Sequence, residues 1–214
     1  MIAFMKATNR KCTYLLLFVT LLICFARPVW ADSWAELQQE SAKIKSIAAH
    51  FSQQKYLHIL AKPLLSNGRF YFQAPDSVRW EYTSPLKSVL LMRKGNIKRY
   101  TMGADAFALD SGGTIESMRL VLQEISRWSK GEFTKSEYFS ATLKEGKEPQ
   151  IILTPKEKEL ATMISRIVIT LAPEKKGFIQ SLKIFENEHN YTIFEFTKVQ
   201  TNANISERLF LEAE

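Results

Sequence analysis

Apolar residues recur along this chain with two different periods, which separate helical segments from a series of strands. The first helical segment places its apolar residues three, four or seven positions apart: Trp34, Leu37, Ile44, Ile47 and Phe51. Ser33 and Glu36 form a capping-box pattern at its start. The pattern predicts an amphipathic helix over residues 33–49, with Ser41 as a polar interruption of its apolar face.

From about residue 51 the period changes to two, which is typical of strands with one buried face. Alternation places Phe70 and Phe72 on one face of a strand. In the next strand it places Val78, Trp80 and Tyr82 on one face, with Arg79 and Glu81 on the other. A hairpin turn is expected at 94–96, between strands over 87–93 and 96–102. These short runs, separated by turns, predict a meander of antiparallel strands.

A second helical stripe follows a loop over 103–113 and ends near Gly131: Ile115, Met118, Leu122 and Ile125. Strands are then expected over 138–144, 149–154, 162–171, 178–186, 191–200 and 205–211. Several of them are apolar on both faces and need a second cover. We therefore expect a mainly β fold with about 10–11 strands, in which a bent antiparallel sheet has helices over an apolar interior.

The N-terminus has the three parts of a secretory signal peptide. Basic residues precede an apolar run over 14–25, and Val29-Trp30-Ala31 ends in small residues at the positions that a signal peptidase reads. The run is short for a membrane anchor, which is the alternative. We expect residues 1–31 to be cleaved and residues 32–214 to form one soluble, exported domain.

Removal of residues 1–31 changes the charge and the cysteine content. Four of the 29 basic residues and none of the 22 acidic residues lie there, so the formal net charge falls from +7 to +3. Nucleic-acid binding therefore has little support. Both cysteines, Cys12 and Cys24, are also lost, which excludes an internal disulfide or a thiolate metal site in the mature chain.

Candidate catalytic groups are few. His50 and Ser111, each in a short protease-like motif, occur in the order found in chymotrypsin-like proteases, but the spacing is too short for the first barrel of that fold. The three histidines show no metal-ligand spacing, and the glycines form no phosphate-binding loop. We expect no enzyme activity, no metal and no cofactor. A structural module that binds a partner protein stays an alternative.

The most specific part of the chain lies between Gly68 and Leu91 and is rich in aromatic residues. Phe51-Ser52-Gln53, Gly68-Arg69-Phe70-Tyr71-Phe72, the run from Pro75 to Pro85 and Val89-Leu90-Leu91 resemble the outer-membrane lipoprotein carrier family (LolA type). The resemblance implies an incomplete antiparallel β-barrel closed by a lid of helices over a hydrophobic cavity. It also implies a periplasmic carrier that takes lipoproteins from an inner-membrane ABC transporter to an outer-membrane acceptor. A carrier of another lipid or lipid-linked amphiphile is the alternative.

On this resemblance and the strand alternation we expect two sets of site residues and a monomer. The acyl-binding cavity is expected to be lined by Phe70, Phe72, Val78, Trp80, Tyr82 and Leu91, and the lid to include Leu37, Ile44, Met118 and Leu122. For each aromatic residue taken alone, an ordinary place in a packed core is the alternative. Many family members carry an arginine that contacts the lid where this chain has Ala74, so either the lid is held differently or the cargo differs.

Overall fold

The structure is a computed structural model that describes residues 34–110, 115–173 and 177–213. Residues 32–214 form a compact unit. Its helices are α2 (Trp34–Ala42), α3 (Ile115–Ser129) and α4 (Lys158–Met163), with short 3₁₀ turns η1 (Phe133–Lys135) and η2 (Glu207–Phe210). Its strands are β1 (Ser46–Tyr56), β2 (Leu64–Gln73), β3 (Ser77–Ser84), β4 (Ser88–Arg93), β5 (Asn96–Met102), β6 (Phe107–Leu109), β7 (Phe139–Lys144), β8 (Gln150–Pro155), β9 (Arg166–Leu171), β10 (Ile179–Phe185) and β11 (Tyr191–Thr201).

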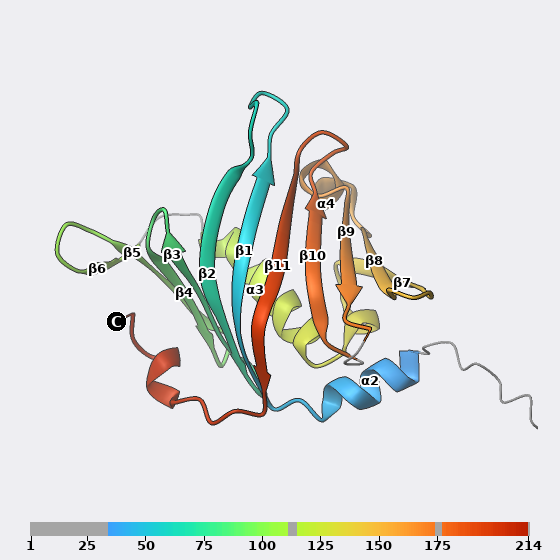
Figure 1. The fold of residues 1–214 in the computed structure, drawn as a ribbon, viewed down its shortest axis with the longest axis horizontal. Coiled ribbons are helices and arrows are strands. Elements are labelled where there is room, and N and C mark those ends of the chain that lie inside the picture. Colours follow the sequence, from blue (N-terminus) through green and yellow to red (C-terminus); the bar gives the residue numbers. More distant parts are fainter. Residues whose placement is uncertain (1–33, 111–114, 174–176, 214) are drawn as a thin grey trace, which may run out of the picture. The chain divides into compact units, whose positions relative to one another are not determined.

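All eleven strands belong to one antiparallel sheet that does not close into a barrel. The strand order is β6-β5-β4-β3-β2-β1-β11-β10-β9-β8-β7, so every neighbour pair except β1–β11 is consecutive in sequence. Helix α3 crosses one face of this sheet, behind β1, β11 and β10 in Figure 1. We call the face covered by α3 the inner face and the opposite one the outer face. The expected mainly β, incomplete-barrel architecture is confirmed.

The hydrophobic core lies on the inner face. In a strand every second side chain points to the same face, and the buried residues of β2 and β9 alternate in this way. The core side chains come from almost every strand and from α2 and α3; they include Leu37, Ile47, Phe51, Phe70, Val78, Leu122, Trp128, Ile151, Ile169 and Phe194. Because both helices contribute to the same cluster, helix and sheet form one core.

The first predicted helix was too long. Helix α2 ends at Ala42, and β1 begins at Ser46 instead of continuing the helix. Ile47 and Phe51 fit a helical spacing and a period of two equally well. As the central strand, β1 pairs with β2 on one side and with β11 on the other, and this pairing decides between the two.

Two other segments differ from the sequence-based expectation. The strand expected over 205–211 is the 3₁₀ turn η2, which packs on β3 and β4 from the outer face and buries Phe210. The strand expected from 162 begins only at Arg166, because residues before it form α4. The loop expected over 103–113 contains the short edge strand β6.

Candidate functional site

Aromatic rings form a continuous layer on the inner face at the centre of the sheet. The ring of Trp80 lies 4.7 Å from that of Phe51, 5.5 Å from Phe70 and 5.2 Å from Phe194, measured between centroids. Phe196 joins the layer at 6.0 Å from Phe70. The rings come from β1, β2, β3 and β11, so they are brought together by the strand order.

Gly68 makes room for this layer. It lies opposite Phe51 in the β1–β2 ladder, and the ring of Phe51 covers it. A Cβ atom at position 68 would lie 2.3 Å from the Phe51 ring and 2.1 Å from the carbonyl oxygen of Glu81. Only glycine fits there, which explains the residue type within the Gly68–Phe72 run.

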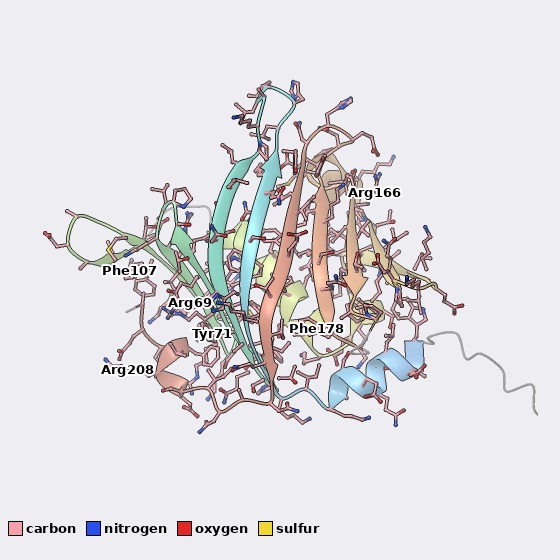
Figure 2. The ribbon with its side chains drawn as sticks, viewed as in Figure 1. Arg69, Tyr71, Phe107, Arg166, Phe178 and Arg208 are labelled. Atoms are coloured by element: carbon pink, nitrogen blue, oxygen red, sulfur yellow. The ribbon has the colours of Figure 1, made fainter. Side chains whose placement is uncertain are left out.

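Five of the six predicted cavity residues lie on this inner face. Phe70, Phe72, Val78 and Trp80 are buried there, and Tyr82 is partly buried. The side chain of Arg69 leaves β2 on the outer face, and so does that of its strand neighbour Tyr71 (Figure 2).

Leu91 is on the outer face, contrary to the expectation. It is paired with Arg79 across β3 and β4, and paired residues share a face. It lines an outer-face groove of about 430 Å³ together with Phe210 and Leu211. The alternation in 88–93 could not be assigned from sequence because both faces of β4 are apolar.

A polar pair lies at one edge of the aromatic layer. The hydroxyl of Tyr82 donates a hydrogen bond to Oε1 of Gln53 at 2.7 Å. Burial raises the pKa of Tyr82, and nearby Trp80 and Arg99 partly offset this rise. The phenol therefore stays neutral at physiological pH, so the inner face carries no charge at this position. Gln53 was not predicted, because a glutamine in a strand gives no signal about its partner.

The four predicted lid residues differ in their position and burial. Leu37 of α2 and Leu122 of α3 are fully buried against the sheet. Ile44 follows the end of α2 and packs against the core from the connection to β1. The side chain of Met118 lies outside the described residues, although its backbone belongs to α3.

Ser41 anchors α2, which explains the polar interruption in its apolar face. It is fully buried, and its hydroxyl donates to the carbonyl of Gly177 at 3.3 Å. A Cβ atom at Gly131 would lie 2.5 Å from the Cβ of Ser41, and Gly131 has a φ of +74°. A small residue at 41 and glycine at 131 therefore permit the close approach of α2 to the end of α3.

Helix α3 carries a buried acid on its sheet-facing side. Glu124 is 1% exposed, and neither carboxylate oxygen has a hydrogen-bond partner within the described part of the chain. The guanidinium of Arg127 lies 3.7 Å away. Burial raises the pKa of Glu124, and the nearby Ser136, Arg127 and Trp128 offset part of this rise. Neither Ser136 nor Trp128 makes a hydrogen bond of good geometry to the carboxylate. Ionisation of Glu124 is therefore unfavourable where α3 packs on the sheet.

Two small cavities lie between α3 and the sheet in the described part of the chain. One cavity of about 30 Å³ lies where Trp128 of α3 meets Ala49, Phe70 and Phe196. A second of about 30 Å³ is bordered by Glu124, Phe139 and Leu182. Neither cavity holds more than about one water-sized molecule.

A metal site, a membrane span and a protease site each place their own requirements on the described residues. Among the described residues, no three His, Cys, Asp or Glu side chains are grouped to hold a metal ion. Within the same residues no helix is long and apolar enough to cross a bilayer. His50 lies in β1, and its protease-like partner Ser111 lies outside the described residues.

Comparison with known proteins gives the family. The model of the family described as outer membrane lipoprotein carrier protein LolA matches residues 42–211. The chain belongs to this family. The outer-membrane lipoprotein carrier protein of Pseudoalteromonas translucida is 25% identical over 210 residues, which cover 94% of this chain and 91% of that protein. Membership in the LolA family supports a carrier that binds lipoproteins.

Solved structures with a similar chain path are more distant. A LolA superfamily protein from Nitrosomonas europaea is 8% identical, with 84% of this chain and 98% of that chain covered and a TM-score of 0.40. LprF from Mycobacterium bovis is 12% identical, with 83% and 97% covered and a TM-score of 0.42. At these values neither structure adds to the argument about the site.

Proposed function

We propose that this LolA-family protein works in the periplasm, where it holds the acyl chains of lipoproteins between α3 and the inner face of the sheet. It receives them from an inner-membrane ABC transporter and delivers them to an outer-membrane acceptor. The observation that carries the proposal is the aromatic layer around Trp80, which is covered by a helix that itself contains an unsatisfied carboxylate.

The energetics favour a cover that opens. Each methylene removed from water contributes about 0.8 kcal/mol, so a long acyl chain gains far more than the loss of a few helix contacts costs. Glu124 and Trp128 have polar atoms without hydrogen-bond partners in the described structure while α3 is closed. The closed form is therefore only modestly favoured, and cargo can shift the population to an open form.

Two neighbouring alanines of β1 provide a matched test. Ala49 lies on the inner face beside Phe70 and Trp128, whereas Ala48 pairs with Tyr71 on the outer face. Ala49→Phe places a ring where acyl chains are expected, and the small cavity cannot accept it without moving α3. Residues 32–214 of each variant are titrated with a fluorescent acyl probe, and their thermal melting is recorded.

The proposal expects Ala49→Phe to weaken probe binding at least about tenfold, while Ala48→Phe binds like the unsubstituted protein. If Ala49→Phe unfolds, Ala49→Leu takes its place in the same comparison. Equal binding by the inner-face and outer-face variants contradicts the proposed site. Failure of the unsubstituted protein to bind any acyl probe favours a module that binds a partner protein. Mass spectrometry of molecules that copurify with the protein distinguishes lipoprotein from another amphiphile.

A further inference from the structure

The hairpin that joins β1 and β2 exposes an unusual amount of apolar surface. We define the tip hairpin as residues 57–66. Its large apolar side chains are widely exposed: Ile59 is 74% exposed, Leu60 41%, Leu64 51% and Leu65 62%. Single exposed apolar residues are ordinary, but four within seven positions form a patch of the kind that marks a binding surface.

The tip hairpin extends past the strands beside it. β2 pairs with β3 only from Asn67, opposite Ser84, so residues 64–66 pair with β1 alone. On the other side β11 begins at Tyr191, opposite Tyr56. The ribbon therefore projects beyond the sheet, as Figure 1 shows above β1 and β2.

Both faces of this ribbon are apolar. Leu64 and Leu65 are successive residues of β2, so their side chains point to opposite faces, and both are more than half exposed. A groove on a partner protein covers one face of a ribbon. A fluid apolar phase covers both faces at once.

The charges around the tip hairpin are mainly positive. Residues 51–75 contain Lys55, Lys62 and Arg69 but no aspartate or glutamate. The β3–β4 turn, at the same end of the sheet, adds Lys87 next to Leu86, which is 78% exposed. In the adjacent β10–β11 turn, Glu186 is paired with Lys55 at 3.0 Å and Glu188 with Arg166 at 2.6 Å.

The backbone of the tip hairpin is partly satisfied from within the protein. The N–H of Leu60 donates to the carbonyl of Leu57 at 2.9 Å, and that of His58 donates to Oδ1 of Asn190 at 2.9 Å. Pro63 has no N–H. If the tip hairpin enters the headgroup region, it therefore brings fewer unpaired backbone N–H groups into the apolar phase than a loop without these hydrogen bonds would.

We propose that the tip hairpin docks the protein on an anionic phospholipid surface, with Ile59, Leu60, Leu64 and Leu65 inserted at the level of the first acyl carbons and Lys62 and Lys87 at the phosphates. Apolar insertion combined with attraction of lysines to anionic lipids is the usual basis of reversible interfacial binding. This docking surface is separate from the site for acyl chains, so it goes beyond the proposed function and does not require it.

Sedimentation with vesicles tests the docking surface. Residues 32–214 are mixed with vesicles of phosphatidylethanolamine and phosphatidylglycerol, and separately with pure phosphatidylcholine. The test variant is Ile59→Ser with Leu65→Ser; both side chains are exposed, so its thermal melt is expected to match that of the unsubstituted protein. The matched control is Leu109→Ser in edge strand β6, where the leucine is 59% exposed. A second test variant, Lys62→Glu with Lys87→Glu, probes the charge.

We expect the unsubstituted protein and Leu109→Ser to sediment with the anionic vesicles and less with phosphatidylcholine. The Ile59/Leu65 variant should partition at least about tenfold more weakly, and the lysine variant should lose its preference for anionic lipid. Absence of vesicle binding by the unsubstituted protein overturns the proposal, as does unchanged binding by the Ile59/Leu65 variant. If that variant instead fails only in transfer to a protein acceptor, the tip hairpin is a protein-docking surface and the proposal is wrong. Acyl-probe binding by the same variants is expected to be unchanged, so failure of docking is distinguishable from failure of the carrier function.

Discussion

Replacing Glu124 by glutamine is expected to stabilise the closed form of α3 at neutral pH. The carboxylate is 1% exposed and lies beside the apolar side chains of Phe139 and Leu182. Its nearest cation, Arg127, is 3.7 Å away and about a quarter exposed. Desolvation of a charge costs several kcal/mol, and attraction to a partly exposed cation at this distance offsets most of that cost. Removing the charge is therefore expected to gain about 1 kcal/mol.

The gain should depend on pH in a defined direction. Burial raises the pKa of Glu124 above its usual value of 4.5. Below that usual value both the folded and the unfolded state hold the proton, and the carboxyl group does not disfavour folding. As the pH rises from the usual value towards the raised pKa, the unfolded state has lost its proton while the folded state still holds it, so the unsubstituted protein loses stability; above the raised pKa the loss levels off. The advantage of Glu124→Gln should be smallest below pH 4.5 and should grow as the pH rises above it.

Urea denaturation at a series of pH values measures the difference in stability between Glu124→Gln and the unsubstituted protein. The rate of acyl-probe uptake at pH 7 measures how readily α3 opens. Uptake by Glu124→Gln is expected to be slower because its closed form is favoured. Glu132→Gln is the control with the opposite sign: despite partial burial, Lys135 and Lys130 lower the pKa of Glu132. The Glu132→Gln variant should be less stable than the unsubstituted protein above pH 4.5, and this deficit should shrink as the pH falls below 4.5. A Glu124→Gln protein that is less stable at pH 7, or equally changed at pH 4 and pH 7, would refute the assignment of Glu124 as an uncompensated charge.

Two further substitutions test how the helices and the C-terminal segment are held. Arg79→Leu should lower the free energy of unfolding in urea by about 3 kcal/mol, because the buried guanidinium binds Glu81 and donates to the backbone carbonyls of Leu209 and Glu212. An unchanged midpoint of urea denaturation would show that η2 is held by Phe210 alone. Ser41→Leu should lower the free energy of unfolding by about 1–3 kcal/mol, because the larger side chain overpacks the site between α2 and Gly131. Limited proteolysis of this variant should cut near α2 first, and a cleavage pattern like that of the unsubstituted protein would contradict this account of helix docking.

Much of the sheet could be predicted from sequence because one face of each strand is buried. Alternation placed Phe70, Phe72 and Trp80 on a common face, and the turn at Lys94 and Gly95 fixed the β4–β5 hairpin, where both residues have positive φ. The family resemblance supplied the architecture, which local patterns alone left open.

The errors have a common physical origin in contacts between residues far apart in sequence. The boundary between α2 and β1 depends on pairing with β11, which no local pattern contains. The same is true of Leu91 and Arg79, whose outer face is covered by the C-terminal turn η2. The roles of Gln53 and Ser41 depend on single partners, Tyr82 and Gly177, that only the folded chain brings near.

The place of β1 in the sheet also has a consequence for how the chain assembles. Strands β1 to β6 and β7 to β11 form two arms in which each strand pairs with its neighbour in sequence, and these local contacts are quick to form. The pairing of β1 with β11 joins the arms at the centre and needs the last strand of the chain. Because β11 is the last strand of the chain, one long edge of β1 stays unpaired until β11 joins it, and an unpaired strand edge invites pairing with other chains. Union of the two arms is therefore the step at which folding competes with aggregation, and a chain that ends before Tyr191 has no means of completing it.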